Sequence, residues 1–224
     1  MKSIFSCFLS ILTFLCASVY GQNGDRESIL AQLNGKERYD FLNEKATQLR
    51  EWQKSFDNST KAYEYALLAQ DKIQAARIFN NLGALYYQQQ NYDKAIEQFR
   101  EGFKLALEVG DINTQIRSLN NIAFNFSQSG RLDSALYYAK RSIAINEDAG
   151  SPYMLSFANR TIGDVFLAKG QYDMAISTFE TSLEMARAQQ VKSFEAGVLH
   201  RLGHAYFLNG EIRKAEELLN YAVD

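Results

Sequence analysis

Two histidines four positions apart are the side chains of this chain best suited to metal chemistry. His200 and His204 are its only histidines, and the i, i+4 spacing puts both rings on one face of a helix. Asp164 lies 40 positions before His204, so a structural repeat of that period would add its carboxylate to make a set of two histidines and one acid. The pattern differs from H-E-x-x-H, and the cationic Arg201 lies beside the pair. We therefore keep a metal-dependent enzyme only as a remote alternative, and we predict no metal and no cofactor.

A second recurring arrangement combines arginine with asparagine. Arg77 with Asn81 and Arg117 with Asn121 are the same i, i+4 pair, separated by the same interval. An asparagine amide both donates to and accepts from a peptide backbone, and an arginine fork pairs with carboxylates. The pairs therefore favour binding of an extended peptide. The alternative is that asparagines bond one another between helices, and it applies to Asn80, Asn81, Asn120 and Asn121.

Signatures of catalysis are otherwise lacking in the sequence. It contains no glycine-rich phosphate loop, no G-x-S-x-G nucleophile elbow, and no acid pair beyond the carboxylates that helical repeats scatter over solvated faces. The formal net charge of −2 also argues against general attraction to nucleic acid or to anionic membranes. We predict that the chain is not an enzyme.

The elements that position these residues recur with a fixed period. Four segments align without a gap, beginning at Asn80, Asn120, Arg160 and His200, so the period is 40 positions. Each contains a small residue, then an aromatic residue, then an alanine, at the same spacing. These columns are Gly83, Ala123, Gly163 and Gly203; Tyr86, Phe126, Phe166 and Tyr206; and Ala95, Ala135, Ala175 and Ala215. A fixed period of this length indicates stacked structural units.

Turn and capping residues recur with the same period. Glycines that can adopt a left-handed conformation follow the first apolar stripe of three units, at Gly130, Gly170 and Gly210. Acidic residues suited to the first turn of a second helix follow at Asp93, Asp133 and Asp173. Candidate N-caps of first helices are Asp71, Asp111 and Ser151, the last followed by Pro152, the only proline. Each unit is therefore predicted to be helix, short turn, helix, in an all-α solenoid.

The columns resemble the tetratricopeptide repeat. Leu82, Gly83, Tyr86, Ala95 and Phe99 follow that family's order of apolar residue, glycine, aromatic residue, alanine and phenylalanine, and the resemblance covers roughly residues 75–224. No copy has the family's closing proline, and the other departures are Ala123 for glycine and Ala139 and Leu219 for the second aromatic residue. The family's usual unit has about 34 residues. The longer units here resemble those of kinesin light chains and bacterial peptide-sensing regulators, and imply a right-handed superhelix of antiparallel helix pairs.

The period predicts the organisation of residues 27–224. We expect a degenerate unit at 27–70 and clear units at 71–110, 111–150, 151–190 and 191–224, the last with a truncated second helix. Three explanations remain open for this last helix: it suffices as it is, a partner covers it, or the chain is the front piece of a longer protein.

Residues 1–21 have the layout of a secretory signal peptide. Lys2 supplies a positive start, and an apolar run from Ile4 to Leu15 precedes small or modest residues before Gln22. An uncleaved anchor helix is the alternative, and residues 22–26 are expected to form a short linker. We predict export to the periplasm or cell envelope of a bacterium.

Cleavage of this leader would change the chemistry of the mature chain. Both cysteines, Cys7 and Cys16, would be removed, so no disulfide or thiolate site would remain. Loss of Lys2 would change the formal charge from −2 to −3. No later segment approaches the length of an apolar membrane span, so the mature segment is predicted to contain none.

The resemblance also implies which side chains line the concave surface, which in this family is formed by the first helices. Its groove positions map onto Arg77, Asn80, Asn81, Tyr87, Arg117, Asn120, Asn121, Gln128, Phe157, Arg160, Asp164, His200, Arg201, His204 and Phe207. In similar repeats of kinesin light chains and peptide receptors, such asparagines hold bound peptide backbones. We predict a protein or an extended peptide as the partner, and no nucleic acid.

Three functions follow as hypotheses. The first is the N-terminal sensory or docking region of an envelope signalling protein of the histidine kinase or transcriptional regulator type. The second is a free-standing periplasmic scaffold or outer-membrane assembly factor, and the coding sequence after residue 224 separates it from the first. The remote third is a metal-dependent enzyme at His200 and His204.

Overall fold

The structure, a computed structural model, describes residues 51–60, 62, 64, 71–149, 151–188 and 192–221. Within these residues every regular element is an α-helix, and most of them have 17 or 18 residues. Besides the helical residues 51–60, they are α4 (Lys72–Gln88), α5 (Tyr92–Val109), α6 (Ile112–Gln128), α7 (Leu132–Ala149), α8 (Pro152–Ala168), α9 (Tyr172–Ala188), α10 (Lys192–Leu208) and α11 (Ile212–Tyr221). The predicted all-α fold is confirmed.

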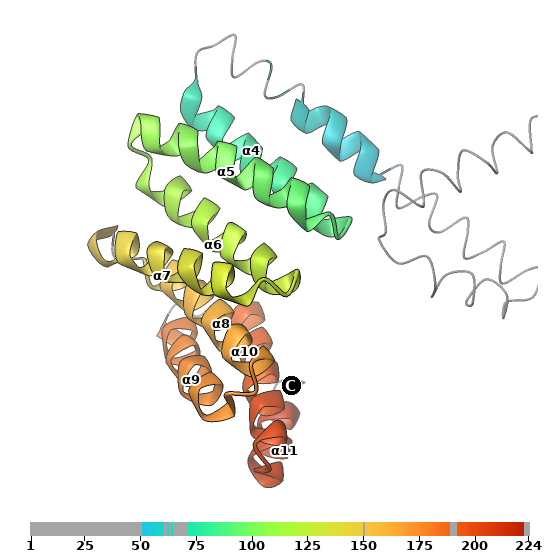
Figure 1. Ribbon diagram of the computed structural model, residues 1–224, viewed down its shortest axis with the longest axis vertical. Helices are drawn as coiled ribbons and strands as arrows, with labels where there is room; N and C mark the ends of the chain where they lie inside the picture. The colour runs from blue at the N-terminus through green and yellow to red at the C-terminus, as the bar shows by residue number, and fades with distance from the viewer. Residues whose placement is uncertain are drawn as a thin grey trace, which may run out of the picture.

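The helices form antiparallel pairs that stack into a solenoid, from α4 and α5 at one end to α10 and α11 at the other (Figure 1). Each helix packs against the next in the chain, and the first helices α4, α6, α8 and α10 also contact one another in succession. Among the described helices, successive second helices have no comparable contacts. The first helices therefore lie on the inner side of the stack, where a helical-repeat superhelix has its concave surface.

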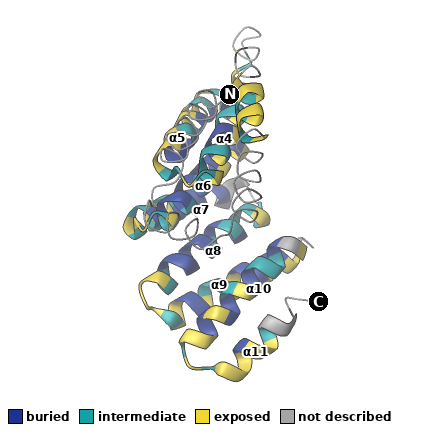
Figure 2. Cartoon of the chain, turned by 90° about the vertical axis from the view of Figure 1, so that its right-hand side faces the viewer, coloured by how far each residue is buried: buried dark blue, intermediate teal, exposed yellow. Residues whose placement is uncertain are grey.

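The buried residues lie where neighbouring helices face each other, and the exposed ones lie on the outer faces and at the turns (Figure 2). Two helix pairs are locked by a phenylalanine ring against a glycine. A Cβ atom at Gly83 would lie 2.6 Å from Cε1 of Phe99, and one at Gly163 would lie 2.5 Å from Cε1 of Phe179. These distances are shorter than any ordinary contact between carbon atoms, so each ring occupies the space of the missing side chain.

In the second unit the two helices make the equivalent contact without a phenylalanine ring. Ala123 stands in place of the glycine and Ala139 in place of the phenylalanine, and both are fully buried. They form a cluster with Ile162 of α8. The two departures from the family pattern therefore compensate each other, because an added methyl group fits only where the ring is absent.

The turns inside the units have the conformation that their glycines indicate. Gly130, Gly170 and Gly210 have φ angles of 74°, 71° and 84°. In the first clear unit the equivalent position holds Gln90, with φ 56°. A residue with a Cβ atom is uncommon in this region, which makes this turn the most strained of the four.

Two of the three predicted N-caps close their helices with a side chain. Asp71 accepts a hydrogen bond from Gln74 N (3.0 Å), and Asp111 accepts one from Thr114 N (3.2 Å). Ser151 lies at the N-cap of α8 but makes no side-chain cap bond. Its backbone is instead held by Asn146, whose amide donates to Ser151 O (2.8 Å).

The acidic residues at the start of the second helices also connect neighbouring units. Each carboxylate pairs with a side chain at the turn of the following unit. The pairs are Arg131 with Asp93 (2.8 Å), Lys169 with Asp133 (2.7 Å) and Asn209 with Asp173 (3.1 Å). Because these carboxylates are exposed, solvent screening keeps the contribution of each pair small.

The predicted degenerate unit at 27–70 is described only in its second half. Residues 51–60 are helical and pack on α4, where Trp52 Nε1 donates to Leu85 O (2.7 Å) and the rings of Phe56 and Tyr86 are 5.5 Å apart. The predicted signal peptide at 1–21 and linker at 22–26 lie outside the described residues.

The last described helix is shorter than helices α4 to α10. Helix α11 has 10 residues, and Leu218 packs against the core cluster of α9 and α10. None of the described helices is long and apolar enough to cross a membrane.

The contact between glycine and ring predicts opposite effects for the same substitution at two helical glycines. We expect Gly163→Ala to lower the free energy of unfolding by about 1–3 kcal/mol, because the new methyl group collides with Phe179. We expect Gly197→Ala to raise it by about 0.5–1 kcal/mol, because alanine is the better helix former and no atom lies within 4 Å of a Cβ built there. Urea denaturation followed by far-UV circular dichroism measures both values.

A double-mutant cycle serves as the control. In a Phe179→Ala background there is no ring to displace, so Gly163→Ala should no longer destabilise the protein. An equal loss of stability in the two backgrounds would contradict this packing account.

Candidate peptide-binding groove

Four aromatic side chains, one from each first helix, form a row across the inner side of the solenoid. The ring centroids of Tyr87 (α4) and Phe124 (α6) are 5.2 Å apart, those of Phe124 and Phe157 (α8) 5.9 Å, and those of Phe157 and Phe194 (α10) 6.2 Å. These distances are typical of attractive aromatic pairs. We call these four residues the aromatic row. It crosses the boundaries between the helix pairs from α4–α5 to α10–α11, and its rings are half-buried except that of Phe194, which is buried.

Half of this row was missed by sequence reasoning. Tyr87 and Phe157 were predicted to line the groove, but Phe124 and Phe194 were not. Phe124 lies one repeat before Asp164, which was predicted, so consistent use of the same column would have found it. Phe194 lies one turn before the groove positions of the family pattern, and no sequence signal singled it out.

Arg160 lies on the first helix α8, with Asp164 one turn further along the same helix. Arg201 of α10 donates from Nη1 to Asp164 Oδ1 (2.7 Å), which joins the two helices. Burial raises the pKa of the Asp164 carboxyl above its ordinary value, although Arg201 and Arg160 act in the opposite direction. The second carboxylate oxygen of Asp164 is buried and has no hydrogen-bond partner among the described residues.

The convergence of His200, His204 and Asp164 that the remote metal-site alternative requires is not found. The Asp164 carboxylate is engaged by Arg201, while both histidines are exposed on α10. No three histidine, cysteine, aspartate or glutamate side chains lie together as a possible metal site in the described part of the chain. The carboxylate that the remote metal-site hypothesis needs is therefore not free, because Asp164 forms a charge-assisted hydrogen bond with Arg201.

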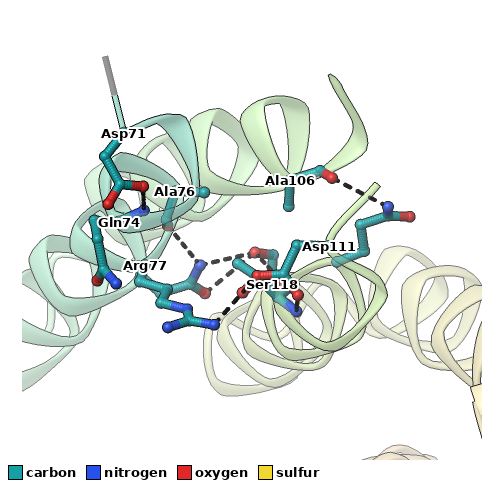
Figure 3. A network of polar contacts seen from close by, with 10 residues as sticks. Asp71, Gln74, Ala76, Arg77, Ala106, Asp111 and Ser118 are labelled. Carbon is teal, nitrogen blue, oxygen red and sulfur yellow. Dashed lines mark hydrogen bonds and ion pairs between the residues drawn. The ribbon is translucent and has the colours of Figure 1, made fainter. Parts of the chain in front are cut away.

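The four asparagines predicted to line the groove differ in whether their amides are accessible. Asn80 is only 4% exposed, and its amide nitrogen donates to Ala76 O (3.1 Å) and Ser118 Oγ (2.9 Å), a network drawn in Figure 3. Asn121 is half-buried and donates to Asn80 Oδ1 (3.3 Å). For Asn80 and Asn121 the interhelical alternative is thus the one observed, since these bonds join α4 to α6.

Asn120 also bridges helices. It is 3% exposed, and its amide nitrogen donates to Met154 O of α8 (3.0 Å). The expected contacts of Asn80 and Asn120 with a ligand are therefore not available, because both amides are enclosed between first helices. Asn81, by contrast, is exposed and makes no side-chain hydrogen bond with the described residues.

The remaining predicted groove residues are largely accessible. Arg77 is paired with Asp111 Oδ2 at 3.7 Å (Figure 3). Burial opposes a low pKa for Asp111, but the bonds from Thr114 and the nearby Arg77 and Arg117 outweigh it and hold that pKa below its usual value. The other accessible members are Arg117, Gln128 and Phe207, all exposed.

The burial of Asn80 and the exposure of Asn81 predict different results for adjacent alanine substitutions. We expect Asn80→Ala to lower the free energy of unfolding by about 1–3 kcal/mol, because Ser118 and Asn121 lose a buried partner. We expect Asn81→Ala to change it by less than about 0.5 kcal/mol. Urea denaturation of the two variants checks the assignment, and equal effects would contradict it.

The chain has relatives of low identity. It is 23% identical over 146 residues to the human "Tetratricopeptide repeat protein 29", a match that covers 65% of this chain and 31% of the relative. The chain thus spans about a third of the length of that relative.

Solved structures share the fold. A Rap protein complexed with Competence and Sporulation Factor superposes with a TM-score of 0.70 at 17% identity, covering 88% of this chain and 56% of that one. A signal transduction ATPase with a tetratricopeptide repeat sensor, from Pyrococcus horikoshii, gives a TM-score of 0.61 at 22% identity, covering 75% of this chain and 26% of that one.

The sequence profile described as "Tetratricopeptide repeat" matches residues 46–108, 74–148 and 153–224. These matches span most of the chain and include all the helix pairs described above. They agree with the period, the glycine and aromatic columns and the stacked helix pairs. The chain belongs to the tetratricopeptide repeat family, whose members generally act as non-catalytic scaffolds for protein interactions.

Proposed function

We propose that this chain binds a protein segment or an extended peptide along the inner side of its solenoid. The aromatic row is the observation that carries the proposal, because the half-buried rings of Tyr87, Phe124 and Phe157 follow one another across three units and the buried Phe194 continues the row. An extended chain can bury apolar side chains on such a strip. Its backbone can then bond to accessible polar groups beside the row, of which Asn81 and Arg117 are available.

We further propose that the chain is the sensory or docking part of an exported bacterial signalling protein. The signal-peptide layout of residues 1–21 supports export. The signalling role is supported by the likeness to a Rap protein solved with Competence and Sporulation Factor and to an ATPase whose repeats are described as a sensor. No catalytic step is assigned to this chain.

A photo-crosslinking experiment tests the location of the bound partner. Replacing Asn81 with p-benzoylphenylalanine in the full chain should yield a covalent adduct with a protein or peptide of the bacterial envelope extract. The same replacement at Tyr137, which is 60% exposed on the second helix α7, should yield none. Gel shift followed by mass spectrometry identifies the adducts. Equal adducts at both positions, or none at position 81, would contradict the groove assignment.

Export is tested by the N-terminus of the mature protein. When the full chain is produced in a Gram-negative host, we expect a periplasmic product that begins at Gln22, because the apolar run directs secretion and cleavage. The double variant Leu9→Arg, Leu12→Arg interrupts that run and should remain intact in the cytoplasm. Intact-mass measurement of both fractions gives the answer, and an unprocessed cytoplasmic wild type would refute export.

A further inference from the structure

A cleft of about 810 Å³ lies between the second helices α9 and α11 at one end of the stack (Figure 1). Helix α10 contacts both of them and supplies the base of the cleft. Because α10 is a first helix, the cleft opens on the outer side, opposite the candidate groove. Its base is apolar: Leu183, Leu202 and Tyr206 are buried there, and Leu218 is half-buried beside them.

Three carboxylates lie on the walls of this cleft. Glu180 and Glu184 belong to α9 and Glu217 belongs to α11, and all three residues are exposed. Glu184 has no ion pair with the described residues. Glu217 lies 3.8 Å from Arg213, but both side chains are largely exposed, so water screens this contact. The charges of Glu184 and Glu217 are therefore available to a ligand.

The third carboxylate is held in place by the base of the cleft. Tyr206 Oη donates to Glu180 Oε1 (2.7 Å), which joins α10 to α9. Burial is the main cause that raises the pKa of Tyr206 to about 12, and the bond to Glu180 adds to it. The hydroxyl therefore keeps its proton at neutral pH and continues to hold the Glu180 carboxylate at the edge of the apolar base.

The two cations of the lining are engaged by other carboxylates. Arg187 Nε donates to Glu195 Oε1 (2.8 Å), and Lys214 Nζ lies 2.6 Å from Glu211 Oε2. Lys214 Nζ also lies 4.9 Å from the centroid of the Tyr206 ring. Because Glu195 and Glu211 are not part of the lining, the charge that the cleft presents to a ligand is negative.

The acidic character is specific to this cleft. Glu180 corresponds to Lys140 one unit earlier and to Arg100 two units earlier, so the sign of the charge is reversed. Between α5 and α7, Arg100 donates to Tyr138 Oη (3.3 Å), and the Tyr138 ring stacks on an aromatic ring of α6. Tyr138 corresponds to Leu218. The smaller leucine leaves open the space that a ring and an arginine occupy between α5 and α7.

We propose that the cleft between α9 and α11 binds a basic amphipathic helix of a partner protein. The lining residues of α9 lie three and four positions apart, from 180 to 187, so the cleft follows about two helical turns. A helix in this cleft places its apolar stripe against Leu218 and the base, and its lysines or arginines beside Glu184 and Glu217. This site is separate from the proposed peptide site on the inner side.

Synthetic peptides of about 15 residues test the chemistry of the occupant. The basic peptide has leucines at helical spacing and lysines elsewhere, the acidic peptide has glutamates in place of the lysines, and the scrambled peptide has the basic composition without an apolar stripe. Fluorescence anisotropy measures their binding to the full chain at about 0.15 M salt, where charges more than about 8 Å apart are largely screened. We expect the basic peptide to bind about tenfold more tightly than either of the others.

Charge-reversal variants locate the bound peptide. Glu184→Lys should weaken binding of the basic peptide about tenfold, because it places a cation beside the peptide's lysines. Glu216→Lys is the matched control, since it makes the same change at an exposed residue of α11 outside the lining, and it should weaken binding less than about twofold. Circular dichroism verifies the helical content of both variants.

A further variant fills the cleft. The double substitution Glu180→Arg, Leu218→Tyr reproduces the pair of Arg100 and Tyr138 found between α5 and α7, so the fold already accommodates this arrangement. The new ring occupies the space above the base, and the arginine removes one of the carboxylates. Binding of the basic peptide should be lost while the helical content stays that of the wild type.

The outcomes decide between the possible occupants. Equal affinities for the basic and acidic peptides, or equal effects of Glu184→Lys and Glu216→Lys, overturn the proposal. Sedimentation velocity without peptide tests a second copy of the chain as the occupant: a wild-type dimer that Glu184→Lys dissociates assigns the cleft to self-association and also overturns the proposal. A monomer in both cases supports a separate partner.

Discussion

The close contact between the two helices of a unit is the constraint on which the rest of this structure depends. In two units a phenylalanine ring lies where the side chain of a glycine would be, with ideal Cβ positions 2.5–2.6 Å from ring atoms. The helices can approach this closely only because one residue has no Cβ atom. In the second unit Ala123 adds a methyl group and Ala139 removes the ring, and both residues are fully buried. The sizes of the two facing residues therefore have to match each other.

This constraint propagates to the groove. Because the helix pairs stack in succession, successive first helices lie side by side on the inner face of the stack. Side chains from different units then meet across helix boundaries, as the 5.2–6.2 Å spacings of the aromatic row demonstrate. The row is therefore a product of stacking, and an isolated unit would not contain it.

Buried polar groups give the stack its register. Asn80 bonds to Ser118 and Asn121, and Asn120 bonds to the backbone of α8. An amide enclosed in this way is satisfied at only one relative position of the two helices, so a displaced helix would leave it unpaired. Gly102 makes room for the first of these amides, since a Cβ there would lie 2.8 Å from Asn80 Nδ2. Glycine thus makes room for a polar group at Gly102, as it makes room for a ring at Gly83 and Gly163.

The period, the helix pairs, the left-handed turns and the family could all be predicted from the sequence, because each depends on local backbone preferences and on residue columns that recur in every unit. The sequence also located the inner face well enough to name Tyr87, Phe157, Arg160 and Arg201.

What those positions do depends on the tertiary structure. Adjacent residues on a helix differ by about 100° in direction, so Asn80 is enclosed between helices while Asn81 is exposed. Asp164 pairs with Arg201 and not with the histidines, because Arg201 is the side chain of the neighbouring helix that lies within hydrogen-bond distance of its carboxylate. Periodicity records the position of a residue along its own helix, but contacts between units depend on how those helices are rotated and stacked.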